Sequence, residues 1–164
     1  MTMTVSVAEL HLLLLESRAT VGVAESLTGG ELAAALSSTP GASATLRGGL
    51  VVYATDLKAT LAGVPAELLD ERGPVDPDVA VALAAGARDR LGATFGVGVT
   101  GVAGPDRQDG VAVGTVFGAV AGPQRSVVES WSFGGSRDEI RAAAVAACVQ
   151  LIAGECRRLA GSLG

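Results

Sequence analysis

The sequence predicts one α/β domain, residues 1–164, in which helices cover both faces of a mixed, mostly parallel sheet. Short apolar runs alternate along the chain with longer segments of helical periodicity, as in successive strand–helix units. Two adjacent strand patterns then flank a short turn, and an alanine-rich helix follows them. These patterns predict a three-layer α/β/α domain with a C-terminal β-hairpin plus helix. A chain of 164 residues has room for one sizeable core, whereas two would be crowded.

Capping residues, prolines and glycines mark the expected helix boundaries. The stretch Ser6–Glu9 has the S-x-x-E spacing of a capping box and predicts a helix to about Ser17. Asp76 ahead of Pro77 predicts an N-cap and a first helical residue, and Gly92 ends that helix. Further helices are expected from Thr28 as N-cap to about Leu36, after Thr55 as a cap, with Pro65 as first residue, and from Ser136 with Asp138 and Glu139 in the first turn.

Five apolar segments are typical of strands. They are Thr20–Ala24, Gly49–Ala54, Phe95–Thr100, Val113–Val120 and Arg125–Phe133. The second reads GLVVYA, a continuous apolar run that predicts a buried strand. The last two flank the turn AGPQ and predict a hairpin. The order of the strands in the sheet does not follow from these patterns.

Charge and hydropathy narrow the class of partner. A net charge of −5 and a pI near 4.8 argue against nucleic acid, which needs a basic face. The N-terminus lacks the basic region of a signal peptide, and the apolar run HLLLL is far too short to cross a bilayer. We therefore expect a cytoplasmic protein with no nucleic-acid or membrane partner.

Cysteine and histidine usage argues against a disulfide and against a metal site. Cys148 and Cys156 lie eight residues apart in one predicted helix, a separation of roughly 12 Å that forbids a disulfide between them. We expect both to be buried as small hydrophobic residues. One histidine and two distant cysteines make a transition-metal site unsupported.

Three polar or glycine-rich segments follow predicted strands, where ligands bind in open α/β sheets. The first is ESLTGG, Glu25–Gly30. Free N–H groups at the start of its helix can bind a phosphate or an oxyanion. In the alternative reading this is an ordinary strand–helix turn in which Thr28 serves only as N-cap.

The second segment, Tyr53–Lys58, supplies a candidate base for a serine nucleophile. The hydroxyl of Ser26 needs such a base, and His11, the one histidine, falls on the apolar face of the first helix. Lys58 follows a predicted buried strand, in the first turn of a helix, where burial and the helix dipole favour the neutral amine. The alternative is an exposed lysine on a helix surface.

The third segment, Thr100–Asp106, reads TGVAGPD and can present backbone amides and a hydroxyl opposite the first. Its glycines can also serve merely to adopt positive φ in a turn. Arg137 and Arg141 lie one turn apart on the last helix and can grip a phosphate or carboxylate, although such pairs are more often solvated.

Taken together, these segments resemble the CinA C-terminal domain family, whose stand-alone members are PncC-type nicotinamide-nucleotide amidohydrolases. The matching residues are AESLTGG (Ala24–Gly30), PGAS…GGLVVYATDLK (Pro40–Lys58), LAGVP (Leu61–Pro65), TGVAGPD (Thr100–Asp106), VGTV (Val113–Val116) and GGSRDEIR (Gly134–Arg141). They occur in the family's order and spacing over nearly the whole chain.

The resemblance implies hydrolysis of the carboxamide of nicotinamide mononucleotide to nicotinate mononucleotide and ammonia, without metal or cofactor. Ser26 is then the nucleophile, Lys58 the general base, and Tyr53 an orienting group. The expected substrate-binding residues are Thr28, Gly29, Gly30, Thr100, Gly101 and Gly104, with Arg137, Arg141 or Arg47 at the phosphate. The resemblance also implies pyridine nucleotide salvage and a homo-oligomer.

Two departures from the family pattern leave alternatives open. The loop after TGVAGPD is shortened here, with Arg107 in place of a glycine and Ala112 in place of a proline. Gly73–Asp76 reads GPVD where the family has GAVS, which exchanges one N-cap for another. The altered loop forms part of the expected pocket wall. A non-catalytic nucleotide-binding module, or an amidase for another small amide, therefore stands beside the main hypothesis.

Overall fold

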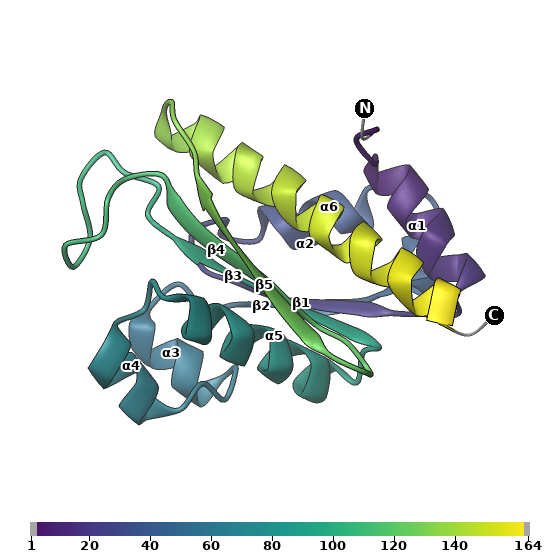
Figure 1. Cartoon of the computed structure of the whole chain (residues 1–164), viewed down its shortest axis with the longest axis horizontal. Coiled ribbons are helices and arrows are strands. Elements are labelled where there is room, and N and C mark those ends of the chain that lie inside the picture. Colours follow the sequence, from purple (N-terminus) through teal and green to yellow (C-terminus); the bar gives the residue numbers. More distant parts are fainter. Residues whose placement is uncertain (1–2, 163–164) are drawn as a thin grey trace.

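In a computed structural model, which describes residues 3–162, a five-stranded sheet separates two layers of helices (Figure 1). The strand order is β2-β1-β3-β4-β5. The bounds are β1 Val21–Glu25, β2 Leu46–Val51, β3 Phe95–Gly101, β4 Thr115–Ala121 and β5 Ser126–Ser132. Strands β2, β1 and β3 run parallel, whereas β4 and β5 pair antiparallel. The predicted mixed sheet and C-terminal hairpin are confirmed.

The helices divide between the two faces of the sheet, as Figure 1 shows. One layer holds α1 Val7–Glu16, α2 Glu31–Ser37 and α6 Arg137–Ser162; the other holds α3 Thr55–Thr60, α4 Ala66–Arg72 and α5 Pro77–Leu91. A short 3₁₀ helix, Ala42–Ala44, precedes β2. Each layer has its own apolar core, the larger one under α1, α2 and α6. The three-layer α/β/α prediction is therefore confirmed.

Alternation along β3 explains how the two layers differ. Its sequence FGVGVTG places Phe95, Val97 and Val99 in the larger core. Gly96 and Gly98 face the other way, where an added Cβ would overlap backbone atoms of α5. Glycine at these two positions lets α5 lie directly on the central strand.

The caps of α1 and α5 match the prediction, and α6 begins where it was expected. At α1, Ser6 accepts from the Glu9 N–H while the Glu9 carboxylate accepts from the Ser6 N–H, which completes the capping box. At α5, Asp76 accepts from the Asp78 N–H at 2.8 Å. A second S-x-x-E pair, Ser136 and Glu139, closes the start of α6.

Other boundaries differ from the prediction. β2 covers residues 46–51 rather than 49–54, and as an edge strand it is half-buried and not fully buried. Thr55 is the first residue of α3 rather than its cap, and Ala54 at the N-cap makes no side-chain bond. Pro65 occupies the N-cap of α4, where its carbonyl accepts from the Leu69 N–H, so the helix begins one residue later than expected.

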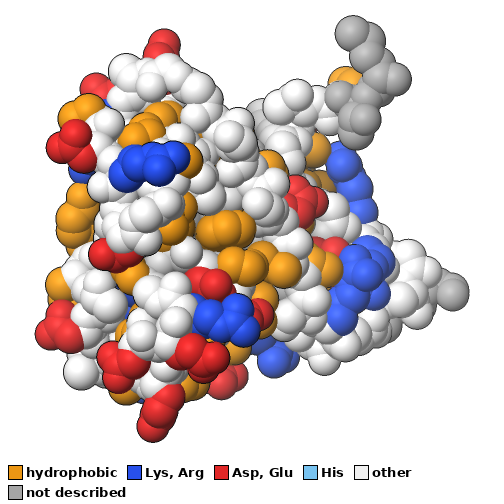
Figure 2. All heavy atoms as spheres, turned by 60° about the vertical axis from the view of Figure 1, so that its left-hand side comes forward, with side chains coloured by type: hydrophobic (Ala, Val, Ile, Leu, Met, Phe, Trp, Pro, Cys, Tyr) orange, Lys and Arg blue, Asp and Glu red, His pale blue; other side chains and the backbone are white. Residues whose placement is uncertain are grey.

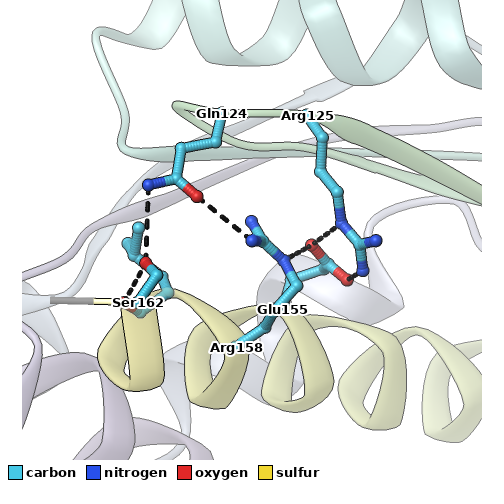
Figure 3. Close-up of polar contacts among 6 residues, drawn as sticks. Gln124, Arg125, Glu155, Arg158 and Ser162 are labelled. Carbon is cyan, nitrogen blue, oxygen red and sulfur yellow. Dashed lines mark hydrogen bonds and ion pairs between the residues drawn. The ribbon is translucent and has the colours of Figure 1, made fainter. Parts of the chain in front are cut away.

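A polar cluster fastens the β4–β5 turn to the end of α6 (Figure 3). The carboxylate of Glu155 accepts two bonds from Arg125 and one from Arg158. Arg158 also donates to Gln124, whose amide lies 3.4 Å from the Ser162 hydroxyl. Glu155 is buried, so this cluster adds paired charge to the apolar packing of the hairpin against α6.

Hydrophobic side chains reach the surface on one face of the molecule (Figure 2), whereas both cysteines are buried. Figure 2 shows hydrophobic side chains across the middle of one face, with acidic and basic side chains around them, in places side by side. Cys148 and Cys156 are free and buried, as predicted. Within residues 3–162, none of the helices combines the length and apolar character that a membrane span requires.

Candidate active site

A cavity of about 130 Å³ opens at the carboxyl ends of β1 and β3. It brings together all three segments that the sequence singled out. The lining residues are Ser26, Leu27, Tyr53, Lys58, Pro74, Val75, Thr100, Gly101, Val102, Ala103, Gly104, Asp106, Gln108 and Arg137. The cavity therefore combines one nucleophilic hydroxyl, one amine and one guanidinium group.

Ser26 has a fixed backbone and a free side chain. Its N–H donates to the carbonyl of Val99 at 3.0 Å, which attaches it to β3. Its carbonyl accepts from the Gly29 N–H at 3.1 Å, which closes the turn behind it. Its hydroxyl has no hydrogen-bond partner among the described residues, and it lines the cavity. This is the arrangement that a positioned nucleophile needs.

Thr28 is not the N-cap of α2, contrary to the prediction. The helix begins at Glu31, after Gly30 in the left-handed region, and no side chain of the N-cap residue bonds to it. The Thr28 hydroxyl instead donates to the carboxylate of Glu25 at 2.6 Å. That carboxylate also accepts from the N–H groups of Leu32 and Ala33 at 2.8 and 3.0 Å. The cap thus comes from the end of the preceding strand.

The capping by Glu25 changes which amides can serve the site. The N–H groups at the start of α2, which the sequence suggested for anion binding, are occupied by Glu25. In contrast, the N–H groups of Leu27 and Thr28 have no acceptor within the described part of the chain. Of these two residues, Leu27 lines the cavity beside the hydroxyl of Ser26.

Lys58 is the only lysine of the chain, and it is 1% exposed. Its Nζ donates to the carbonyls of Val52 and Tyr53 at 2.8 and 3.2 Å. Burial lowers the pKa of this amine from its ordinary value to about 8. The alternative of an exposed surface lysine is excluded. Ser26 and Lys58 face the same cavity without a hydrogen bond between their side chains among the contacts of residues 3–162.

The glycine turn after β3 forms the opposite wall. Thr100 lines the cavity, and its hydroxyl donates its proton to the carbonyl of Pro74 at 2.7 Å. Gly101 and Gly104 line the cavity, as expected. The earlier glycines, Gly29 and Gly30, adopt positive φ angles of 58° and 104° in the nucleophile turn and lie outside the lining, as does Thr28.

The three candidate arginines have different places. Arg137 lines the cavity, donating to the carbonyl of Gly104 and, at 2.9 Å, to the phenol oxygen of Tyr53. Arg141 lies outside the lining; it donates to the carbonyl of Leu27 at 3.0 Å and pairs with Glu31. Arg47 stands near the start of β2 and donates to the carbonyl of Leu91 at 2.9 Å, away from the lining.

Asp106 and Gln108 lie in the loop after β3 that was expected to form part of the pocket wall. Pro74 and Val75, from the α4–α5 connection, were missed by the sequence analysis. Their place depends on strand order, which local patterns do not encode. Glu25 carried a readable signal, because a carboxylate that ends an apolar strand run must find buried donors.

His11 and the remaining acidic groups lie apart from this site. His11 is 8% exposed and its Nδ1 lies 2.9 Å from the Thr45 hydroxyl, outside the cavity lining. The described residues contain no group of three or more His, Cys, Asp or Glu side chains placed to hold a metal ion.

Comparison with known proteins adds a family to this geometry. The family model described as CinA C-terminal domain matches residues 4–156. A CinA-like protein of Frankia casuarinae is 48% identical over 149 residues, which are 91% of this chain and 34% of that protein. A putative competence-damage inducible protein of Desulforamulus reducens is 41% identical over 85% of this chain. This chain thus spans about a third of the length of the curated relatives it matches.

Solved structures agree with the fold. A CinA superfamily protein from Klebsiella pneumoniae superposes with a TM-score of 0.90 at 25% identity, covering 93% of this chain and 96% of that one. A competence/damage inducible protein from Agrobacterium tumefaciens gives 0.83 at 32% identity, covering 93% and 97%. With the family match over residues 4–156, these similarities show that the chain belongs to the CinA C-terminal domain family.

Proposed function

We propose that this domain is an amidohydrolase that converts the carboxamide of nicotinamide mononucleotide to the carboxylate, releasing ammonia. The observation that carries the proposal is the burial of the chain's only lysine in the cavity that also exposes the Ser26 hydroxyl. A buried amine with its pKa lowered to about 8 is a base that is partly neutral near physiological pH. The family resemblance supports the choice of substrate.

Acylation follows from the placement of the two groups. Ser26 Oγ attacks the carboxamide carbon while neutral Lys58 takes the hydroxyl proton. The resulting oxyanion is assigned to the free N–H group of Leu27, which lines the cavity; one such donor is typically worth about 3–4 kcal/mol. When the C–N bond breaks, the Lys58 ammonium returns its proton to the leaving nitrogen, and ammonia departs.

Deacylation uses the same base. A water molecule gives a proton to Lys58 as its oxygen forms a bond to the acyl carbon. The bond from Ser26 Oγ to that carbon then breaks, and Lys58 returns the proton to the serine oxygen. The product is nicotinate mononucleotide, and the enzyme regains its starting protonation state without a metal or cofactor.

The rim of the cavity is assigned to the rest of the nucleotide. Arg137 is the one arginine of the lining. Its guanidinium donates to Gly104 and, at an exposed contact, to Tyr53, and it can give up these hydrogen bonds to bind a phosphate. Tyr53 would orient the substrate. Arg141 would hold the turn that carries Ser26, through its hydrogen bond to the Leu27 carbonyl. The proposal places the enzyme in cytoplasmic pyridine nucleotide salvage, as a homo-oligomer.

Ammonia release from nicotinamide mononucleotide by the purified chain tests the proposal. Ser26→Ala and Lys58→Arg should each lower kcat by at least about a thousandfold, because the first removes the nucleophile and the second replaces the base with a permanent cation. Ser43→Ala, on an exposed serine, is the matched control. Full activity in folded Ser26→Ala would refute the proposal.

A second candidate is a non-catalytic nucleotide-binding module. It is favoured by the lack of a direct hydrogen bond between Ser26 and Lys58 among the described contacts, and by Arg107 in the pocket loop. Titration calorimetry separates the two: binding of the mononucleotide without turnover supports the module. Turnover of another small amide in preference to the mononucleotide would instead support a related amidase.

A further inference from the structure

We propose that Glu25 is a positioning residue for Ser26, holding the turn that carries the nucleophile by joining the end of β1 to the first turn of α2. This inference rests on the proposed role of Ser26. Glu25 is fully buried and lies outside the cavity lining, so it acts through its neighbours rather than on the substrate.

The carboxylate of Glu25 accepts three hydrogen bonds from the segment that follows it. Oε1 accepts from the Thr28 hydroxyl at 2.6 Å and from the Leu32 N–H at 2.8 Å, and Oε2 accepts from the Ala33 N–H at 3.0 Å. Thr28, like Glu25, has no exposed surface. Both oxygens are thus engaged by donors within eight residues of Glu25.

Only a carboxylate fits this set of donors. Each of the three partners gives a proton, so the two oxygens must both accept. An amide in place of the carboxylate would set its own NH₂ group against one of these donors. The start of α2 carries the positive end of the helix dipole, which favours the negative charge further.

Fixing this carboxylate fixes Ser26, because Ser26 is the next residue. On one side, the Glu25 carbonyl accepts from the Val52 N–H at 2.8 Å, which attaches it to the chain just after β2. On the other side, Arg141 donates to the carbonyl of Leu27 at 3.0 Å. The turn that carries Ser26 is therefore held at one end by Glu25 and at the other by Arg141, a residue of α6.

The proposal predicts a specific kinetic pattern for Glu25→Gln. A nucleophile displaced by a fraction of an ångström still lies in an intact pocket, so kcat should fall by about a hundredfold. KM should stay within about twofold, because the rim groups that bind the nucleotide do not contact Glu25. Glu67→Gln, which removes an exposed carboxylate from the first turn of α4, is the control and should behave like the parent.

Thr28 supplies a second pair of variants that keeps the proposal testable if Glu25→Gln does not fold. Thr28→Val keeps the shape of the side chain but removes the donated proton, and should lower kcat in the same way. Thr28→Ser keeps the hydroxyl and should restore kcat to within about threefold of the parent. Expressed per folded molecule, a kcat lowered in Thr28→Val but not in Thr28→Ser, with KM unchanged in both, distinguishes positioning of Ser26 from a loss of folded protein.

Hydrogen exchange of the full chain gives a readout that does not depend on activity. In Glu25→Gln, the hydrogen-bonded amides among residues 26–33 should exchange at least about tenfold faster, while α6 exchanges as in the parent. Parent-like kcat and parent-like exchange in Glu25→Gln and in Thr28→Val would overturn this inference while Ser26→Ala remains inactive. Full activity in Ser26→Ala would instead overturn the proposed function itself.

Discussion

The Lys58 amine determines how the proposed reaction depends on pH. Burial lowers its pKa to about 8, so the neutral form that accepts the Ser26 proton grows as pH rises through that value. We expect kcat/KM to increase about tenfold per pH unit below pH 8 and to level above it. Initial rates of ammonia release between pH 6 and pH 10 measure this profile. A rate independent of pH over this interval would exclude Lys58 as the base.

The same residue predicts a pH-dependent stability. The pKa of Lys58 is about 8 in the folded protein and about 10.4 in an unfolded chain, so between these values the unfolded state binds more protons. The free energy of unfolding of the parent, relative to Lys58→Met, should therefore rise with pH across that window by about 3 kcal/mol.

Paired urea titrations at pH 7.5 and pH 10 measure this difference. Well below pH 8, near pH 6, the difference between the two proteins should stay constant, because Lys58 is then protonated in both states. Groups shared by the parent and Lys58→Met cancel in the comparison. A difference that does not change with pH would mean that burial does not lower the pKa of Lys58.

At the scale of elements, the Glu155 cluster at the end of α6 shown in Figure 3 yields a stability prediction. Arg125, chiefly, and Arg158 hold the pKa of the Glu155 carboxyl below its usual range, against the opposing effect of burial. A lowered folded-state pKa stabilises the protein above the unfolded-state pKa, and this contribution is lost as pH falls through the folded-state value. Glu155→Gln should therefore cost about 1–2 kcal/mol at pH 7.

Thermal unfolding at pH 7 and in acid tests this cluster. The gap in Tm between the parent and Glu155→Gln should narrow as pH falls below the unfolded-state pKa of a glutamate, about 4.3, and should close as Glu155 becomes protonated in the folded protein. Glu67→Gln, which removes an exposed carboxylate, should show no such gap. Equal Tm values for the parent and Glu155→Gln at pH 7 would contradict the role assigned to the cluster.

Features that depend on residues close together in the sequence were predicted, whereas features that depend on contacts between residues far apart in the chain were not. The capping box of α1 depends on residues three apart, and the hairpin depends on two strand patterns beside one turn. The cap of α2 comes from Glu25, seven residues before Leu32, so Thr28 looked like the cap. The hydrogen bond from Arg141 to the Leu27 carbonyl joins residues that lie 114 positions apart in the sequence. The helical spacing of Arg137 and Arg141 could not predict this contact.

At the scale of the whole molecule, the strand order decides which predicted segments meet. β1 and β3 are neighbours although α2, β2 and three further helices separate them in the chain. This adjacency lets the Ser26 N–H reach the Val99 carbonyl and sets the Thr100 turn across the cavity. Because pairing of distant strands is a property of the folded whole, the sequence indicated the segments of the site but not their neighbours.

The close packing of α5 on β3 links this architecture to the site and gives a last prediction. A Cβ at Gly98 would overlap the Ala80 carbonyl oxygen and the Ala84 nitrogen, backbone atoms that cannot turn aside. Gly98→Ala should therefore cost about 2–3 kcal/mol and lower Tm by about 5 °C or more. Val99, the next residue, holds the Ser26 N–H, so ammonia release should fall as well.

Gly154→Ala is the matched control, because Gly154 lies exposed in α6 with nothing within 4 Å of an added Cβ. Replacing a helical glycine by alanine there should raise stability by about 0.5–1 kcal/mol and leave ammonia release unchanged. If Gly98→Ala lowers Tm while Gly154→Ala raises it, the loss of stability in Gly98→Ala comes from the close contact between β3 and α5. If Gly98→Ala were as stable as Gly154→Ala, α5 would have room to move away from β3, and the central strand would not be fixed by that helix.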